Sequence, residues 1–114
     1  MLAKQYRLRK QSELDRVFQK GKVFNNSFLS LRRGDNNLIV NRFAFLVGAK
    51  VFKKASLRNK VKRRIRQIIR EILPLMKRGY DVIFIVKNPG FIGKKHIEVK
   101  LMVQNLARTA GLIL

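Results

Sequence analysis

The chain has 114 residues, of which 46% are hydrophobic, and a formal net charge of +21 from 27 basic and 6 acidic residues. This length is typical of one domain, expected over residues 1–114, and the hydrophobic content argues against disorder. Self-repulsion of this size predicts a nucleic-acid partner. The chain has no cysteine, which excludes disulfides and thiolate metal sites, and its single histidine, His96, cannot form a multi-histidine site.

The N-terminal sequence MLAKQYRLRK lacks the continuous apolar stretch of a signal peptide. No apolar run approaches the length of a membrane span. We therefore expect a cytoplasmic protein with no membrane partner.

The first expected element is a short helix over residues 12–20. Ser12 is a candidate N-cap, with Asp15 three residues on as in a capping box. Helical spacing places three apolar side chains on one face: Leu14, Val17 and Phe18. The Phe18 ring has two possible roles, packing in the core or stacking on an RNA base.

Two strand-like segments follow at residues 27–33 and 38–48, with turn residues at 34–37 between them. In the second segment, alternation directs Phe43, Phe45 and Val47 to one side. The nearly continuous apolar run YDVIFIVK at residues 80–87 predicts a central strand.

The clearest helix begins after Ser56, a candidate N-cap, and ends or kinks at Pro74. Its apolar stripe consists of Leu57, Val61, Ile65, Ile68, Ile69 and Ile72. A last helix over residues 95–108 is expected to use Ile97, Leu101 and the 103–106 region as its apolar positions. The order of elements predicts an α+β sandwich of helices on a small sheet.

Lys and Arg occupy 10 of the 21 positions from Lys50 to Arg70, and no acidic residue interrupts them. A solvated helix normally mixes charges, so this excess predicts a polyanionic ligand rather than a merely soluble surface. A helical wheel places Arg63, Arg66 and Arg70 opposite the apolar stripe. Arg58 falls on the apolar side, so it must project from the first turn or lie at the helix entrance, beside the free N–H groups.

The residues show no catalytic constellation. The six acids are scattered between elements, and the phosphate-binding glycine loop of nucleotide hydrolases is absent. Catalytic and metal-ligating residues are therefore expected to be absent. Arg7, Arg9 and Lys10, just before the first helix, form a second candidate RNA contact.

The run KKASLRNKVKRRIRQIIRE at residues 53–71 resembles the Arg-Asn-Arg signature of the bacterial ribonuclease P protein subunit. In this chain the signature is carried by Arg58, Asn59, Lys60, Lys62, Arg63 and Arg66. YRLRKQSELDRVFQKG and YDVIFIVKNPG resemble the opening and the last strand of the family. The resemblance covers nearly the whole chain.

The resemblance implies an α+β sandwich similar to domain 2 of ribosomal protein S5, with a four-stranded sheet and a left-handed strand-helix-strand crossover. It implies a protein that binds the catalytic RNA and the 5′ leader of precursor tRNA and assists endonucleolytic removal of the leader. Hydrolysis would belong to the RNA and to Mg²⁺ held mainly by RNA and substrate. The protein alone would be inactive, with no obligate protein partner.

The contacts with the catalytic RNA that the resemblance implies are Lys50, Arg58, Asn59, Lys60, Lys62, Arg63 and Arg66. The charge pattern adds Lys53, Lys54 and Arg70 as candidate RNA contacts. The implied leader cleft contains Leu14, Phe18 and Leu31. Leu14 and Leu31 replace aromatic residues of many members, Lys60 replaces the second arginine of the signature, and Lys53 and Lys54 stand where a Gly-Asn pair is common. The main alternative is a ribosomal protein or general RNA chaperone. A self-sufficient nuclease and a membrane-surface helix fit the residues less well.

Overall fold

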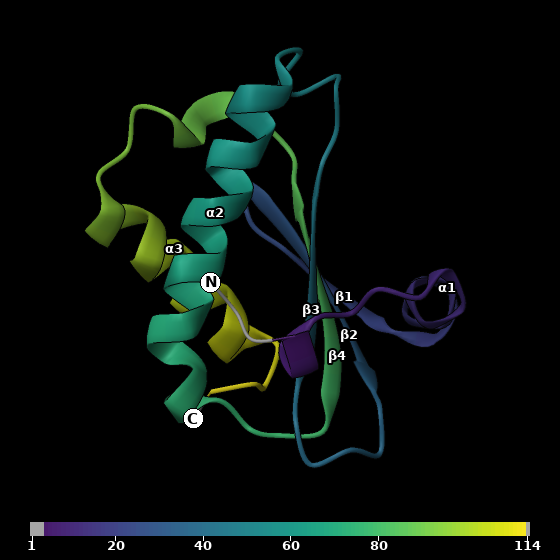
Figure 1. Ribbon diagram of the computed structural model, residues 1–114. Helices are drawn as coiled ribbons and strands as arrows, with labels where there is room; N and C mark the ends of the chain where they lie inside the picture. Colours follow the sequence, from purple (N-terminus) through teal and green to yellow (C-terminus); the bar gives the residue numbers. More distant parts are fainter. Residues whose placement is uncertain (1–3, 114) are drawn as a thin grey trace.

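The computed structural model describes residues 4–113 and shows a four-stranded sheet with helices on both faces (Figure 1). The helices are α1 (Gln11–Lys20), α2 (Ala55–Ile72) and α3 (His96–Thr109). The strands are β1 (Lys22–Asn25), β2 (Leu29–Asp35), β3 (Arg42–Val47) and β4 (Tyr80–Val86). Helices α2 and α3 cover one face of the sheet, and α1 crosses the other. The predicted α+β fold is confirmed.

The strand order is β1-β2-β4-β3, which places β4 inside the sheet as predicted. Strand β2 pairs antiparallel with β1 and β4, whereas β3 pairs parallel with β4. The sequence analysis did not locate β1, which follows α1 directly. Gly21 makes this junction possible, because a Cβ there would lie 2.5 Å from the Val17 carbonyl oxygen and 2.9 Å from that of Arg33.

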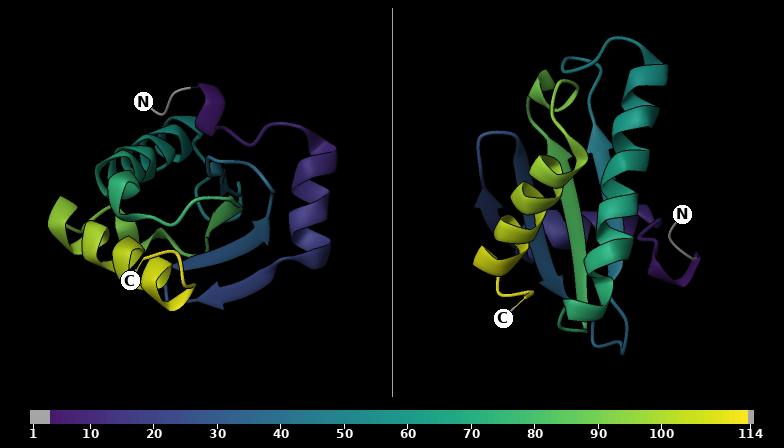
Figure 2. Two further views of the ribbon diagram at one scale, coloured as in Figure 1. Left: turned by 90° about the horizontal axis from the view of Figure 1, so that it is seen from below. Right: turned by 90° about the vertical axis from the view of Figure 1, so that its left-hand side faces the viewer.

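The connection from β3 through α2 to β4 is left-handed. In the right-hand view of Figure 2, α2 lies in front of the sheet, and β3 and β4 both run upward. The second strand, β4, lies to the left of β3 in this view, whereas a right-handed crossover would place it on the right. The handedness implied by the family resemblance is confirmed.

Strand alternation divides the sheet into two apolar faces. Phe43, Phe45 and Phe84 point toward α2 and α3, and the predicted stripe of α2 packs against them. Its buried members are Val61, Ile65, Ile68, Ile69 and Ile72. Ala44 and Ile83 point the other way, toward α1. Among the described residues, no helix is both long and apolar enough to span a membrane.

Both predicted serine caps are wrong. Helices α1 and α2 each begin one residue before the expected serine, with Lys10 and Lys54 in the N-cap positions and no side-chain cap hydrogen bond. Ser12 and Ser56 therefore lie within the first turn, where a hydroxyl no longer occupies the capping position. Asp15 does not close a capping box, and its carboxylate accepts a 2.8 Å hydrogen bond from Gln11.

The expected apolar face of α3 is also wrong in part. The side chains of Ile97 and Leu101 are 58% and 51% exposed. The buried positions are Val99, Val103, Leu106 and Ala107. Spacings of three and four residues fit both sets, and packing against the sheet and α2 selects the second.

An ion-pair network attaches α1 to the middle of the sheet. The Arg42 guanidinium on β3 binds both carboxylate oxygens of Asp81 on β4, with N···O distances of 2.8 Å, and also contacts Glu13 on α1. Asp81 is only 3% exposed and accepts a further hydrogen bond from Asn36. The hydrogen bond to Asp81 raises the pKa of Arg42 against the opposing effect of burial. Arg42 therefore holds three elements together.

Replacing Arg42 with alanine should lower the free energy of unfolding by about 3–5 kcal/mol, because Asp81 would remain buried without its cation. Arg42→Lys should lose less, since the charge remains while the two-pronged hydrogen bonding is lost. Urea denaturation followed by circular dichroism measures both changes. Equal stability of Arg42→Ala and the unmodified protein would show that the network does not hold the sheet.

A second charged cluster joins α2 to α3. Glu71 on α2 forms an ion pair with Lys100, whose ammonium nitrogen lies 3.0 Å from a carboxylate oxygen. The other carboxylate oxygen lies 3.2 Å from Nε2 of His96. The Lys100 hydrogen bond, followed by that of His96, lowers the pKa of Glu71 from 4.5 to about 2. The ionised carboxylate thus stabilises the folded chain above pH 4.5, and this contribution disappears as the pH falls toward 2.

Glu71→Gln should lower the free energy of unfolding at neutral pH by about 0.5–1 kcal/mol, the range of exposed ion pairs. The difference from the unmodified protein should shrink as the pH falls through the interval from 4.5 to 2, where the native carboxylate also becomes neutral. Thermal unfolding across this pH range measures the difference. Glu98→Gln is the matched control, because Glu98 only reaches Lys94 at 3.9 Å. A difference independent of pH would contradict the assignment.

Candidate RNA interface

The exposed side of α2 carries a row of cations opposite its buried stripe. Arg63 and Arg70 are exposed and Arg66 is half-buried, whereas Val61 and Ile65 face the core. The predicted separation of a basic face from a core face is confirmed. Because both faces belong to one packed helix, the cations are held in fixed relative positions.

The entrance to α2 is built around Arg58. Lys50, Lys53 and Lys54 are exposed in the segment before and at the helix start. The Arg58 guanidinium turns back and donates hydrogen bonds of 2.8 and 2.9 Å to the carbonyl oxygens of Phe52 and Lys53. Arg58 lies at the entrance as predicted, and it also fixes the backbone that presents the lysines.

Arg66 extends from α2 over the edge of the sheet. Its guanidinium carbon lies 5.6 Å from the centre of the Phe45 ring on β3. Burial, followed by the nearby charge of Arg7, lowers the pKa of Arg66. A phosphate placed between Arg66 and Arg7 would oppose both effects on the pKa of Arg66, because a nearby anion favours the charged guanidinium.

Arg66 and Arg7 line a groove of about 420 Å³ between α2, the N-terminal segment and the face of the sheet that α1 crosses. We call it the α1 groove. Its remaining lining residues are Leu8, Arg9, Leu14 and the four β3 residues 43–46. Cations on the walls and apolar side chains on the floor suit single-stranded RNA, whose phosphates and bases contact different groups. The groove brings together the predicted residues Arg7, Arg9, Leu14 and Arg66.

A family model for ribonuclease P matches residues 2–110, which include every helix and strand described above. The chain belongs to the ribonuclease P protein family. It is 38% identical over 109 residues to the ribonuclease P protein component of Clostridium kluyveri, covering 94% of this chain and 96% of that protein. It is 37% identical over 113 residues to that of Synechocystis, covering 98% and 90%.

Solved ribonuclease P proteins share the fold. The protein from Thermotoga maritima superposes with a TM-score of 0.81 at 27% identity, covering 90% of this chain and 96% of that chain. The Staphylococcus aureus protein superposes with a TM-score of 0.85 at 23% identity, covering 96% and 98%. The second likeness supports the fold alone.

Two of the three residues expected in the leader cleft of this ribonuclease P protein lie outside the α1 groove. The prediction that Leu31 lines the leader cleft is wrong, because its side chain is fully buried beneath α2 and α3, on the opposite face of the sheet from α1. Phe18 is 36% exposed and does not line the groove. Its ring lies on α1 with the Arg32 guanidinium carbon 4.9 Å from the ring centre, so this partly exposed side chain packs against a cation.

Sequence reasoning missed Leu46 and Ala44, which form part of the floor of the α1 groove. The signal was present: if Phe43, Phe45 and Val47 face the core, the residues between them must face the other side. Lys10, expected as an N-terminal contact, is exposed at the start of α1 but does not line the groove.

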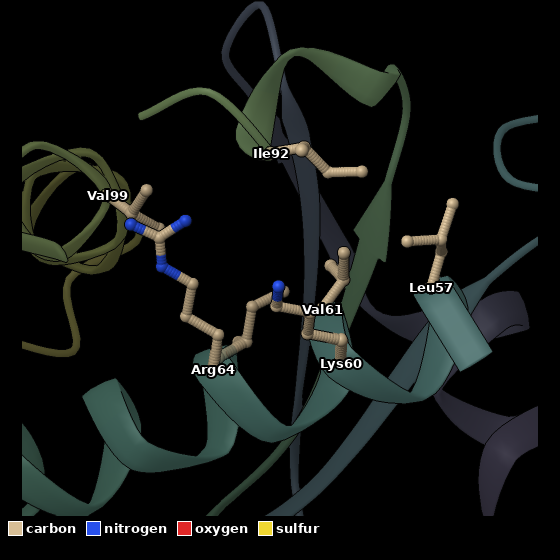
Figure 3. A pocket seen from close by; sticks show the side chains of 7 residues that line it. Leu57, Lys60, Val61, Arg64, Ile92 and Val99 are labelled. Carbon is tan, nitrogen blue, oxygen red and sulfur yellow. The ribbon is translucent and has the colours of Figure 1, made fainter. Parts of the chain in front are cut away.

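Lys60 and Asn59 of the predicted signature are exposed on the first turns of α2, and Lys62 is half-buried. Lys60 stands at a small cleft of about 50 Å³ formed by α2, Ile92 and Val99 (Figure 3). On the same side of the cleft, Arg64 donates a hydrogen bond to the Lys94 carbonyl oxygen and so ties α2 to the segment before α3. Lys60 therefore lies apart from the α1 groove.

The donor set does not fit a protein-held magnesium site. Residues 4–113 contain no group of three His, Cys, Asp or Glu side chains that could hold a metal ion. The best-placed carboxylates, Asp81 and Glu13, bind Arg42 instead.

Arg58 and Arg63 should respond differently to truncation. Arg58→Ala removes two hydrogen bonds to backbone carbonyls and should lower the free energy of unfolding by about 1–2 kcal/mol. Arg63→Ala, on the exposed face, should stay within about 0.5 kcal/mol of the unmodified protein. Both variants should bind bacterial ribonuclease P RNA less tightly and with a shallower salt dependence.

Urea denaturation and filter binding over a salt series separate these effects. Arg58→Lys is the control for charge without the fixed guanidinium geometry. An unchanged affinity and salt slope for Arg63→Ala would place the RNA contact on another surface.

Proposed function

We propose that this chain is the protein component of ribonuclease P. It binds the catalytic RNA and the 5′ leader of precursor tRNA and assists the Mg²⁺-dependent endonucleolytic removal of the leader in tRNA 5′ maturation. The family membership and the relatives named ribonuclease P protein component support this proposal. The observation that carries it is the position of Arg66, which belongs to the cation row of α2 and also lines the α1 groove.

The basic face and entrance of α2 supply the contact with the catalytic RNA. The cations assigned to it are Lys50, Lys53, Lys54, Arg58, Lys60, Lys62, Arg63, Arg66 and Arg70, and the neutral Asn59 completes the set. Each phosphate that such a cation neutralises releases condensed counterions, which gives affinity without sequence preference. A folded RNA offers phosphates in a fixed arrangement, which a rigid helix can match.

The α1 groove supplies the contact with the leader. Its apolar floor, including Leu14 and Leu46, favours unpaired bases over a duplex, whose bases are stacked inside. Arg7, Arg9 and Arg66 stand where the leader phosphates would run. Phe18, with its accessible ring on the same helix as Leu14, extends this surface along α1. Arg66 joins the two surfaces, so RNA subunit and substrate would be bound side by side.

The chain is thus a subunit of an endoribonuclease, and we assign the hydrolysis itself to the partner RNA. This assignment is supported by the carboxylates of residues 4–113, which do not gather into a group of three or more that could hold a metal ion. Mg²⁺ would be held mainly by the RNA and the substrate. The protein contributes binding and positioning, which lower the concentration of free cation needed to offset phosphate repulsion.

A ribosomal protein or general RNA chaperone would also be small and basic. Nothing in the family comparison supports that alternative, since the matched relatives are ribonuclease P proteins. A chaperone would also act on many RNAs without accelerating one cleavage. The decisive property is therefore stimulation of a defined reaction.

Reconstitution tests the proposal directly. The protein should lower the Mg²⁺ concentration that a bacterial ribonuclease P RNA requires to cleave precursor tRNA, and it should cleave nothing by itself. Arg66→Ala should weaken both holoenzyme assembly and precursor binding, because it touches both surfaces. Cleavage at the mature 5′ end, followed on gels across a magnesium series, measures the effect.

Lys22→Ala and Lys95→Ala are the matched controls, because they remove equal charge from exposed positions outside α2 and the α1 groove. These two variants should stimulate the RNA as well as the unmodified protein. Absence of any stimulation with an RNA that is active at high Mg²⁺ would overturn the proposed function.

A further inference from the structure

A second groove, of about 410 Å³, lies along the C-terminal half of α2. It is bounded by Arg70 and the turn after α2, by the loop before β3, and by Tyr6 at the N-terminus. Arg78, in the segment before β4, also lines the groove. We call it the distal groove.

The distal groove continues the α1 groove. In three parts of the chain, residues close together in sequence line the two grooves. The distal groove has Tyr6, Asn41 and Arg70, and the α1 groove has Arg7, Phe43 and Arg66. Arg66 and Arg70 are one helical turn apart, a rise of about 6 Å. The N-terminal segment lines both grooves and is attached to β3 by a 2.8 Å hydrogen bond that Leu8 donates to the Phe43 carbonyl oxygen.

The lining of the distal groove has the chemistry of a nucleotide site. Arg70 and Arg78 are exposed, and neither forms an ion pair with any residue between 4 and 113. No carboxylate is among the lining residues, and the two arginines are the charged ones. The other lining residues include Tyr6 and the apolar Val40 and Met76, which suit a base rather than a bare phosphate.

We propose that the distal groove binds the part of a long 5′ leader that extends beyond the α1 groove. The inference rests on the proposed function and adds Tyr6 and Arg78 as contacts to the leader, whereas Arg70, like Arg66, would be shared between the leader and the catalytic RNA. Charge complementarity selects a polyanion, and continuity with the α1 groove selects the strand already bound there. The catalytic RNA, which could supply the same phosphates, is the competing occupant that the experiment distinguishes.

The test compares precursor tRNAs with leaders of about 4 and about 12 nucleotides, spanning the usual range of single-strand site sizes. Each is bound to the reconstituted holoenzyme carrying either the unmodified protein or Arg78→Ala. The variant should bind the long-leader precursor about fivefold to tenfold more weakly, with the short-leader precursor unaffected. Its salt slope for the long leader should fall by about 0.7, the value for one single-strand phosphate contact.

A second measurement does not depend on a variant. A photoreactive uridine near the 5′ end of the long leader should crosslink to the peptide containing Tyr6 or Arg78, and one near the cleavage site should not. Lys95→Ala is the charge-matched control and should leave both affinities unchanged. Weakening of both precursors to the same degree, or no crosslink to either peptide, would overturn the proposal.

Weaker binding of Arg78→Ala to the catalytic RNA alone would assign the groove to the RNA subunit and also overturn the proposal. Failure of the proposed function is separately visible, because the unmodified protein would then stimulate no cleavage of either precursor.

Discussion

Four of the six carboxylates of this chain bind cations of the framework, and no carboxylate lines either of the two proposed RNA grooves. Glu13 and Asp81 bind Arg42, and Glu71 binds Lys100 and His96. None of them lines the α1 groove or the distal groove. The few acids therefore fix helices to one another and to the sheet, while the remaining cations repel one another. A bound polyanion stabilises such a fold by mass action, because it binds the folded arrangement of charges and not the unfolded chain.

Helix α2 both fills the core and presents the cations. Its buried isoleucines form the centre of the core, and the residues between them hold the cations outside. Arg66 shows the electrostatic consequence, since it is partly desolvated over Phe45 and close to Arg7. The free protein thus holds two like charges near each other at the mouth of a groove. That arrangement is unfavourable alone and favourable around a phosphate, as expected of a preorganised anion site.

The elements predicted correctly were those whose sequence pattern allows only one side of the helix or one position in the sheet to be buried. The stripe of α2 and the continuous apolar run of β4 are long enough to define a buried face or a central strand. Helix α3 admits two overlapping stripes, and only contact with the sheet chooses Val103 over Leu101. The prediction for Leu31 was wrong for a similar reason. Alternation along β2 shows which residues share a face, but the face covered by α1 depends on the path of the chain after Lys20.

The grooves follow from the way the sheet protects its edge. Strand β3 lies at the end of the strand order, and an uncovered edge strand is a template for aggregation. The N-terminal segment covers it through the bridge between Arg7 and Phe43, and this places Tyr6 and Arg7 between β3 and α2. The left-handed crossover brings α2 beside the same edge. Edge protection thus creates two cationic grooves on either side of one short segment, and α2 supplies an arginine to each.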